Sequence, residues 1–358
     1  MSSHPLYTTP VTEDQWEIPG TFETVFNWEY DDQRDRLVSL YKKGKDKQWD
    51  AAERIDWSLE VDPENPSQMP DEANIGIYGS EIWERMTEAE KVELRRHVEA
   101  WRASQFLHGE QGALICSSKI VQAVPDIDSK FYAATQVIDE ARHVEAYSRY
   151  VHTKVKLAYP INPNLRTLLE QVIRDSRWDF TYLGMQVLIE GLALAAFGLI
   201  RDAAQNPLAA SINAYVMQDE ARHVAFGRLA LRDYYPQLTQ AERDEREDFV
   251  VEACYLMRDR FKAEEIWENV GLPVRECAQY VDTSERMQMF RNILFMRIVP
   301  IVKDIGLWGE KVQKAYADMG VLDFASIDPD VAAAQDEDIA EQFDLRRRQI
   351  EDTIAAAE

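Results

Sequence analysis

One six-residue segment occurs twice in this chain of 358 residues, and the two copies lie 80 positions apart. The sequence Asp-Glu-Ala-Arg-His-Val begins at Asp139 and begins again at Asp219. The same offset places Glu110 on Glu190, and each of these glutamates lies in an apolar stretch without proline. Because chance is a poor account of two repeats in register, we infer two copies of one helical hairpin, each with a lone glutamate and a Glu-x-x-His sequence.

The positions of proline predict four long helices around this repeat. The segments run from 84 to 124, from about 126 to 155, from about 165 to 204 and from 207 to 236, and prolines separate them. No window shows the sustained apolar–polar alternation of a half-buried strand. We therefore expect an all-α chain whose four long helices, joined by short connections, form an antiparallel bundle.

We expect three parts along the chain. Residues 1–80 are rich in proline, tryptophan and tyrosine and are interpreted as an arm that wraps a core, with a loose extension as the alternative. Residues 81–236 hold the bundle. Residues 237–358 add helices that pack on the bundle within one structural domain, at about 240–269, 283–305, 308–318 and 331–356.

The repeated glutamates and histidines predict a metal centre. Glu140 and His143 are three residues apart, as are Glu220 and His223, so each pair shares one helix face. One such pair is usually a solvated helix face. Four carboxylates and two imidazoles inside one bundle are instead costly unless cations compensate their charge. This mixture of oxygen and nitrogen ligands suits iron or manganese better than zinc.

These residues resemble the ferritin-like di-iron carboxylate superfamily over about residues 100–230. The resemblance implies a ferritin-like four-helix bundle, a cofactor of two iron ions (with a manganese–iron pair as the alternative) and O2 as cosubstrate. It assigns the ligands of one metal as Glu110, Glu140 and His143. It assigns those of the other metal as Glu190, Glu220 and His223.

The twice-repeated Asp-Glu-x-Arg-His is similar to the hydroxylase subunits of bacterial multicomponent monooxygenases. That resemblance implies that Asp139 orients His223 and that Asp219 orients His143, each across the two hairpins. The arginine of each copy would neutralise these carboxylates or, alternatively, lie exposed on its helix; the two residues are Arg142 and Arg222.

Tyr147 lies one turn after His143, a spacing that resembles the radical tyrosine of the radical-generating subunit of ribonucleotide reductase. A cavity wall or plain core packing is the alternative. The C-terminal residues 352–358 lack the aromatic, acidic tail with which that subunit docks its partner. Two further positions depart from known branches: Val216 replaces the third histidine of arylamine N-oxygenases, and Leu194 replaces a monooxygenase threonine.

The resemblance implies an oxidoreductase of the monooxygenase type, which activates O2 and oxidises a small apolar or aromatic substrate. An electron donor, either a reductase or a ferredoxin, is implied by analogy. A radical-generating subunit and an iron-storage or peroxide-scavenging protein are the competing interpretations. Tight helix packing is the alternative to a substrate cavity, whose candidate residues are Phe106, Ala113, Leu114, Ala193, Leu194 and Phe197.

Composition restricts the partners and the compartment. With 40 Lys and Arg against 64 Asp and Glu, the net charge of −24 repels a phosphate backbone and argues against nucleic-acid binding. Three separated cysteines suit a reducing compartment. The N-terminus lacks the order of a signal peptide, and the apolar run 187–200 is shorter than a membrane span. We expect a cytoplasmic protein that does not enter a membrane, with a homodimer as a possible assembly.

Overall fold

The computed structural model describes residues 6–9, 15–20, 23–31, 34–69 and 72–355. The outermost residues of both termini considered above, 1–5 and 356–358, therefore lie outside the described residues. Within the described part, all regular elements are helices, apart from one isolated parallel bridge between Tyr7 and Ala158. The all-α fold class is confirmed.

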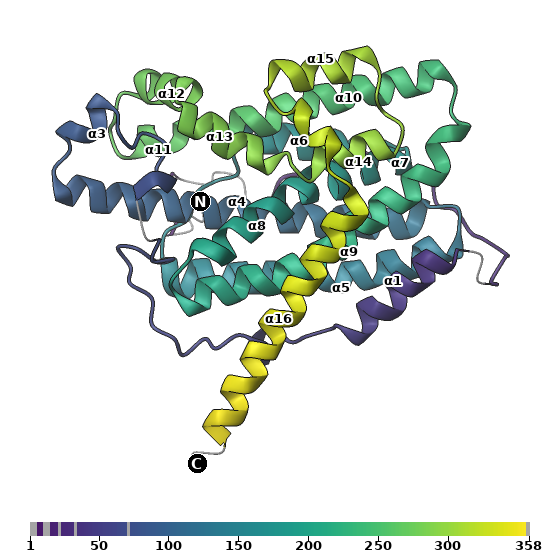
Figure 1. Cartoon of the computed structure of the whole chain (residues 1–358), viewed down its shortest axis with the longest axis horizontal. Helices are drawn as coiled ribbons and strands as arrows, with labels where there is room; N and C mark the ends of the chain where they lie inside the picture. Colours follow the sequence, from purple (N-terminus) through teal and green to yellow (C-terminus); the bar gives the residue numbers. More distant parts are fainter. Residues whose placement is uncertain (1–5, 10–14, 21–22, 32–33, 70–71, 356–358) are drawn as a thin grey trace.

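The four long helices form the bundle at the centre of Figure 1. Helix α4 packs against α5, α8 packs against α9, and α5 packs against α9. The third of these helices is continuous but is built from three successive parts, α7, η3 and α8. The bounds are α4 (Glu88–Ala123), α5 (Ile127–Tyr150), α7 (Trp178–Tyr182), η3 (Leu183–Ile189), α8 (Glu190–Ala203) and α9 (Pro207–Tyr234).

Capping residues fix where these helices begin. Thr87 and Glu90 form a capping box, so α4 starts at Glu88 and the preceding Glu81–Arg85 becomes a separate short helix, α3. Asn206 caps α9 directly before Pro207, a residue suited to the first helical position. The predicted helix from residue 84 is therefore interrupted by a stronger start signal three residues later.

The segment η3 is a π-helix that ends immediately before Glu190. Such segments insert a residue into an α-helix and are frequent at functional sites. The chain packs closely here, because a Cβ atom built on Gly227 of α9 would lie 2.5 Å from the Cβ atom of Gln186. Nothing in the apolar sequence of η3 signals this winding, and we did not predict it.

Replacing Gly227 with alanine is expected to lower the free energy of unfolding by about 1–3 kcal/mol, because the added methyl overpacks the contact between α9 and η3. Gly109 of α4 is the matched control, since a Cβ atom there meets no atom within 4 Å. Alanine at 109 is expected to be neutral or to stabilise the helix by up to about 1 kcal/mol. Urea titration measures both; equal effects would contradict the close packing at Gly227.

The N-terminal segment contributes two helices that lie against the bundle. Helix α1 (Asp35–Asp46), purple in Figure 1, packs on α5 and α9, and α2 (Ala51–Arg54) follows it. The predicted arm therefore contains two separate helices between residues 35 and 54. The short turn η1 (Glu72–Asn74) precedes α3. Packing of α1 brings residues 48–49 next to the repeated segments, a contact that matters for the site.

Additional helices cover the upper face and one side of the bundle in Figure 1, where α16 crosses α9 obliquely. The predicted helix 240–269 breaks at Ala263, which adopts a left-handed conformation with φ 47°. The predicted helix 283–305 is likewise divided, and α12 was not predicted. The remaining bounds are η2 (Val151–Val155), α6 (Pro163–Arg174), η4 (Tyr235–Gln237), α10 (Gln240–Asp259), η5 (Arg260–Lys262), α11 (Glu264–Asn269), α12 (Val274–Thr283), α13 (Glu285–Leu294), α14 (Ile298–Asp304), α15 (Glu310–Asp318), η6 (Leu322–Ser326) and α16 (Pro329–Ala355).

One stretch, Trp178–Ala203, is long and apolar enough to cross a membrane by length and composition. The sequence analysis considered only residues 187–200 and predicted a segment too short for a membrane span. That prediction is wrong, because the helix extends back to Trp178 through η3. However, 78% of its most apolar window is buried inside the protein, which is typical of a core helix. One cluster of buried apolar residues extends from Leu37 to Val321, so the proposed boundaries at residues 80 and 236 do not divide the core.

Candidate metal centre

The two hairpins bring six predicted side chains to the middle of the bundle. Each helix contributes at the level where the repeat predicts, and none of the six residues is more than 5% exposed. They are Glu110 of α4, Glu140 and His143 of α5, Glu190 at the start of α8, and Glu220 and His223 of α9.

The two imidazole rings face a shared set of carboxylates. His143 Nδ1 lies 3.1 Å from Glu110 Oε2, 3.3 Å from Glu140 Oε2 and 3.2 Å from Glu220 Oε1. His223 Nδ1 lies 3.1 Å from Glu140 Oε1 and 3.5 Å from Glu220 Oε2. Glu140 and Glu220 each face both histidines, so both carboxylates would help to hold a metal pair together with the two imidazoles.

The donor atoms fall into two overlapping groups whose members all lie within 4.8 Å of one another. One group is Glu110, Glu140, His143 and Glu220; the other is Glu140, Glu190 and His223. The expected division gave Glu140 to one metal and Glu220 to the other. The geometry instead shares Glu140 between the groups, because a carboxylate between the helices can turn one oxygen to each side.

An aspartate from the opposite hairpin holds the outer nitrogen of each imidazole. His143 Nε2 lies 3.1 Å from Asp219 Oδ2, and His223 Nε2 lies 3.2 Å from Asp139 Oδ2. If each Nε2–H is donated to its aspartate, each Nδ1 keeps a lone pair directed at the glutamates. The structure therefore brings together the pairs that the sequence analysis named.

The two repeated arginines lie inside this network and not on an exposed face. Arg142 pairs with Asp139 and also reaches Asp219 at 3.2 Å. Arg222 pairs with Asp219 and lies 3.9 Å from Asp139. Both arginines are 7% exposed, so the alternative of exposed helix arginines is wrong.

The excess negative charge of the buried cluster matches the positive charge of two divalent cations. The six carboxylates of Glu110, Glu140, Glu190, Glu220, Asp139 and Asp219 face only two guanidinium groups, those of Arg142 and Arg222. Metal ligation requires ionised carboxylates and neutral imidazoles, and in that state four negative charges remain, which two divalent ions would balance. An uncompensated charge of this size is too costly for a buried site.

Individual atoms in the cluster also lack partners. Among the described residues, one oxygen each of Glu140, Glu190 and Glu220, together with His223 Nδ1, is buried without a hydrogen bond. Burial raises the pKa of Glu110 to about 8, and burial with the nearby Glu220 and Glu140 raises the pKa of Glu190 well above its ordinary value. These donors fit a pair of metal ions, which would supply both the missing contacts and the missing charge.

Three further side chains complete the network, and the sequence analysis missed them. The indole N–H of Trp49 donates to Asp219 Oδ2 at 2.8 Å, and Gln48 Nε2 donates to Asp139 Oδ1 at 2.8 Å. Gln136 Nε2 donates to oxygens of Glu140 and Glu190, both at 3.0 Å. Gln136 lies one turn before Glu140 on the same face, so helical spacing alone could have identified it.

Tyr147 is buried beside the cluster. Its hydroxyl donates to Asn213 Oδ1 at 3.1 Å, and its ring stacks on Phe197 with centroids 5.9 Å apart. Burial raises the pKa of the Tyr147 hydroxyl well above its ordinary value. The residue therefore stays protonated, and it closes one side of the aromatic layer that it forms with Phe106.

A small inner cavity of about 30 Å³ adjoins the carboxylates. Four of the predicted cavity residues line it: Phe106, Ala113, Ala193 and Phe197. Leu114 and Leu194 are not among the residues that line this inner cavity, and their place in a substrate cavity stays a prediction. Each is one position beyond a lining alanine, and one helical step turns a side chain by about 100°.

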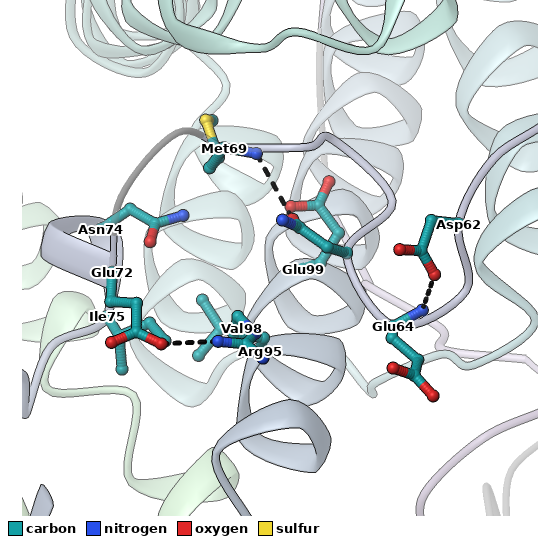
Figure 2. Close-up of a pocket in the computed structure, with 10 residues that line it drawn as sticks. Asp62, Glu64, Met69, Glu72, Asn74, Ile75, Arg95, Val98 and Glu99 are labelled. Atoms are coloured by element: carbon teal, nitrogen blue, oxygen red, sulfur yellow. Dashed lines mark hydrogen bonds and ion pairs between the residues drawn. The ribbon is translucent and has the colours of Figure 1, made fainter. Parts of the chain in front are cut away.

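Two larger hollows adjoin this cavity in turn, because each shares lining residues with the next. A middle cavity of about 340 Å³, mostly apolar, shares Gln105, Phe106 and Arg260 with the inner cavity. An outer cavity of about 390 Å³ shares Met69, Asn74 and Val98 with the middle cavity. Figure 2 shows the outer cavity, where several acidic side chains gather and Arg95 pairs with Glu72 at 2.5 Å. The outer cavity does not touch the metal centre itself.

Residues 30–306 match the family model of the p-aminobenzoate N-oxygenase AurF. The chain belongs to this family. Its members are di-iron oxygenases, so this chain is an O2-activating oxidoreductase that acts on an organic substrate with a di-iron or manganese–iron cofactor. The predicted superfamily is confirmed. Val216 therefore marks a departure within the N-oxygenase family and does not separate the chain from it.

Comparison with solved structures gives matches of low sequence identity, and two of them are described here. One is a protein with aldehyde deformylating oxidase activity from Synechococcus, 16% identical, with a TM-score of 0.44 over 65% of this chain and 98% of that one. Another is a variant of an R2-like ligand-binding oxidase with an anaerobically reconstituted Mn/Fe cofactor, 16% identical, with a TM-score of 0.46 over 76% and 94%. No curated protein sequence matches the chain.

Proposed function

We propose that this member of the N-oxygenase family holds its two metal ions with the six converging side chains and oxidises a small aromatic or apolar substrate beside them. The observation that carries the proposal is the pair of overlapping donor groups, with atoms within 4.8 Å, next to the inner cavity. The proposed ligands are Glu110, Glu140, His143, Glu190, Glu220 and His223.

When bound, the metal pair supplies the binding and reduction of O2. The protein contributes orientation and charge. Asp139 and Asp219 fix the imidazole tautomers, while Arg142 and Arg222 neutralise those aspartates. Phe106 and Phe197 line the inner cavity, which has room for about two water-sized molecules.

N-oxygenation of an aromatic amine is the first reaction to test, because it is the activity in the family's name. Support for an aromatic substrate comes from the middle cavity, which is lined by Trp101, Phe106 and Trp267. Its volume of about 340 Å³ lies within the usual range for small-molecule sites. In this chain Val216 cannot ligate a metal, so the proposed site has two histidines.

The test is to load metal-free protein with ferrous iron without oxygen and then mix it rapidly with O2, alone and with a panel of arylamines. We expect two irons per chain and substrate-dependent consumption of O2. Binding of fewer than two metals, or O2 consumption that no substrate changes, would overturn the proposal. A persistent tyrosyl radical that is absent from Tyr147→Phe would instead favour a radical-generating subunit.

Three further properties belong to this proposal. An oxygenase reaction requires two electrons per turnover from outside the chain, so we propose a reductase or ferredoxin as electron donor. The absence of cysteine pairs supports a cytoplasmic location. A homodimer is compatible with the additional helices, and sedimentation of the metal-loaded protein measures the assembly.

Replacing Asp219 with asparagine is expected to weaken metal binding by about 10–100-fold, because His143 loses the carboxylate that fixes its tautomer. Metal competition with a chromophoric chelator measures the affinity. Asp233→Asn is the matched control on the same helix, since Asp233 pairs with Arg34 at an exposed position away from the centre. Equal affinities for wild type and Asp219→Asn would show that the aspartate does not act through the imidazole.

A further inference from the structure

The residues one helical turn before the four proposed glutamate ligands differ between the two ends of the bundle. On α4 and α9 these residues are the apolar Phe106 and Val216. On α5 and η3 they are Gln136 and Gln186, and both glutamines are fully buried. Because the two helices of each hairpin run antiparallel, the two apolar residues lie toward one end of the bundle and the two glutamines toward the other. The metal centre therefore has polar neighbours toward one end only.

The polar end continues one turn further from the centre on both helices. Tyr132 lies one turn before Gln136, and Tyr182 lies one turn before Gln186. Gln136 bonds to a proposed ligand on each of the two helices. Both tyrosine rings pack on Phe226 of α9, with ring centroids 4.3 and 4.9 Å from it. These four polar side chains form two polar rows that lead away from the metal centre side by side.

The polar rows contain atoms without hydrogen-bond partners. Among the described residues, none bonds to the hydroxyl of Tyr132, to Oε1 of Gln136 or to either amide atom of Gln186. All three side chains are 0% exposed, so bulk water does not reach them either. Buried polar atoms in folded proteins almost always have a partner, and where the protein supplies none an internal water molecule does so.

Other buried side chains of the same types find their partners within the protein. Gln105 donates to the carbonyl of Pro160 at 3.0 Å and accepts from the N–H of Asn162 at 2.7 Å. The buried hydroxyl of Tyr147 donates to a side-chain amide of α9. Gln186 differs from these residues, because both of its amide atoms need a partner that the described residues do not supply.

The outer end of the polar rows lies beside charged groups that solvent reaches. Burial and the nearby Asp126 raise the pKa of Tyr182 well above its ordinary value, whereas Ser129 and Arg34 lower it. Arg34 Nη1 lies 3.2 Å from Asp126 Oδ2 and 3.4 Å from Ser129 Oγ. The side chains of Arg34 and Asp126 are 23% and 31% exposed. The polar rows therefore extend from the metal centre to a partly exposed cluster at the end of the bundle.

We propose that water molecules bound along the polar rows carry protons from the cluster of Arg34, Asp126 and Ser129 to the metal centre. This assignment rests on the proposed function, since O2 reduction consumes the protons. Transfer of one oxygen atom to an organic substrate releases the other atom as water. That reaction takes up two electrons, from the proposed reductase or ferredoxin, and two protons from solvent.

The chemistry of the polar rows suits this task. A water molecule or a tyrosine hydroxyl both donates and accepts a hydrogen bond, so it can receive a proton on one side and release one on the other. An amide carries one acceptor and two donors, which hold a water molecule in a fixed orientation. The hydroxyl of Tyr132 and the amide of Gln186 are therefore assigned to the route itself and to the positioning of its water molecules, respectively.

Diffraction at high resolution from crystals of the wild-type protein tests for these water molecules, both without metal and with ferrous iron under nitrogen. We expect ordered water within hydrogen-bond distance of the Tyr132 hydroxyl and of the Gln186 amide in both forms. Gln186→Met is expected to lose the water beside residue 186, because a thioether is a poor hydrogen-bond partner. Wild-type crystals that show other internal water molecules but none beside these two groups would overturn the proposal.

Single-turnover kinetics test for proton delivery. Ferrous-loaded wild type, Tyr132→Phe, Gln186→Met and Tyr316→Phe are mixed with O2 and 4-aminobenzoate in H2O and in D2O, and the oxidation of iron is followed by absorbance. Tyr132→Phe and Gln186→Met are expected to react about tenfold or more slowly than wild type, with a larger ratio of the rates in H2O and D2O, because proton transfer becomes the slow step. Tyr316→Phe is the matched control, since Tyr316 is equally buried but lies beside Cys254, away from the polar rows.

The control is expected to show the wild-type rates in both solvents. Tyr132→Phe and Gln186→Met that bind two irons and react at the wild-type rate in both solvents would contradict the proton route. So would a lower melting temperature of Tyr132→Phe with an unchanged ratio of rates, which is the result of a purely structural tyrosine. Failure of the proposed function is distinguishable, because it appears as fewer than two irons per chain in wild type, whereas the water molecules are observed without metal.

Discussion

Replacing Glu140 with alanine is expected to remove both metal ions together. The carboxylate of Glu140 belongs to both donor groups and faces both histidines. Its loss leaves each ion with fewer ligands and removes one of the charges that holds the pair. We expect bound iron to fall from two per chain to fewer than about 0.5, and O2 consumption to fall by at least about 100-fold. Metal analysis and an oxygen electrode measure the two quantities.

Glu145→Ala is the matched control for this variant. Glu145 is on the same helix as Glu140 but is exposed. Its replacement removes the same side chain and the same negative charge from that helix without changing the buried cluster. The control is expected to retain two irons and full activity. If Glu140→Ala also retained two irons per chain, the shared carboxylate would not be a ligand, and the geometry of the centre would need another explanation.

Replacing Glu190 with glutamine is expected to change the stability of metal-free and metal-loaded protein in opposite directions. Burial, together with Glu220 and Glu140, raises the pKa of Glu190. An ionised Glu190 therefore destabilises the metal-free protein. A neutral amide of the same shape relieves that repulsion. With metal bound, however, the amide is a weaker ligand and supplies no charge.

In wild type, binding of two divalent ions at concentrations far above their dissociation constants is expected to raise the melting temperature by about 10 °C. Glu190→Gln is expected to melt at or above the wild-type temperature without metal, and to gain less than half of this increase with metal. Differential scanning calorimetry under nitrogen measures all four states. A metal-free variant that melts well below wild type would show that Glu190 has a structural role, and an undiminished gain with metal would exclude it as a ligand.

The bundle and the six converging side chains could be predicted because they follow from helical periodicity. Residues three apart share a helix face whatever surrounds them, and the offset of 80 residues places Glu110 and Glu190 at matching levels of two hairpins. Proline and capping residues then set the helix ends to within a few positions. These rules involve only residues close together in the sequence, and they are enough to place the bundle helices and the six side chains.

Features that depend on contacts between distant segments could not be predicted. Trp49 reaches Asp219 across 170 positions because α1 packs on the bundle, and no pattern around Trp49 indicates that contact. Arg260 is one of many charged residues in a helix until the break at Ala263 places it between two cavities. The π-helical winding before Glu190 likewise has no signal in the apolar sequence, which suits an ordinary helix.

A comparison of two matched positions in the repeat would have identified one more residue of the site. Gln136 lies 80 residues before Val216, so the two hairpins differ at this matched level. In the structure Gln136 bonds to two of the proposed ligands, whereas Val216 is fully buried and apolar. Comparing the two copies position by position would have marked the glutamine as a polar residue that faces the centre.

The most direct test of the central claim is anomalous diffraction at the iron absorption edge from crystals of the protein loaded with ferrous iron under nitrogen. Our account predicts two anomalous peaks per chain, one beside the Nδ1 atom of His143 and one beside that of His223, with Glu140 between them. A single peak, no peak within the bundle, or peaks at the acidic outer cavity would contradict it.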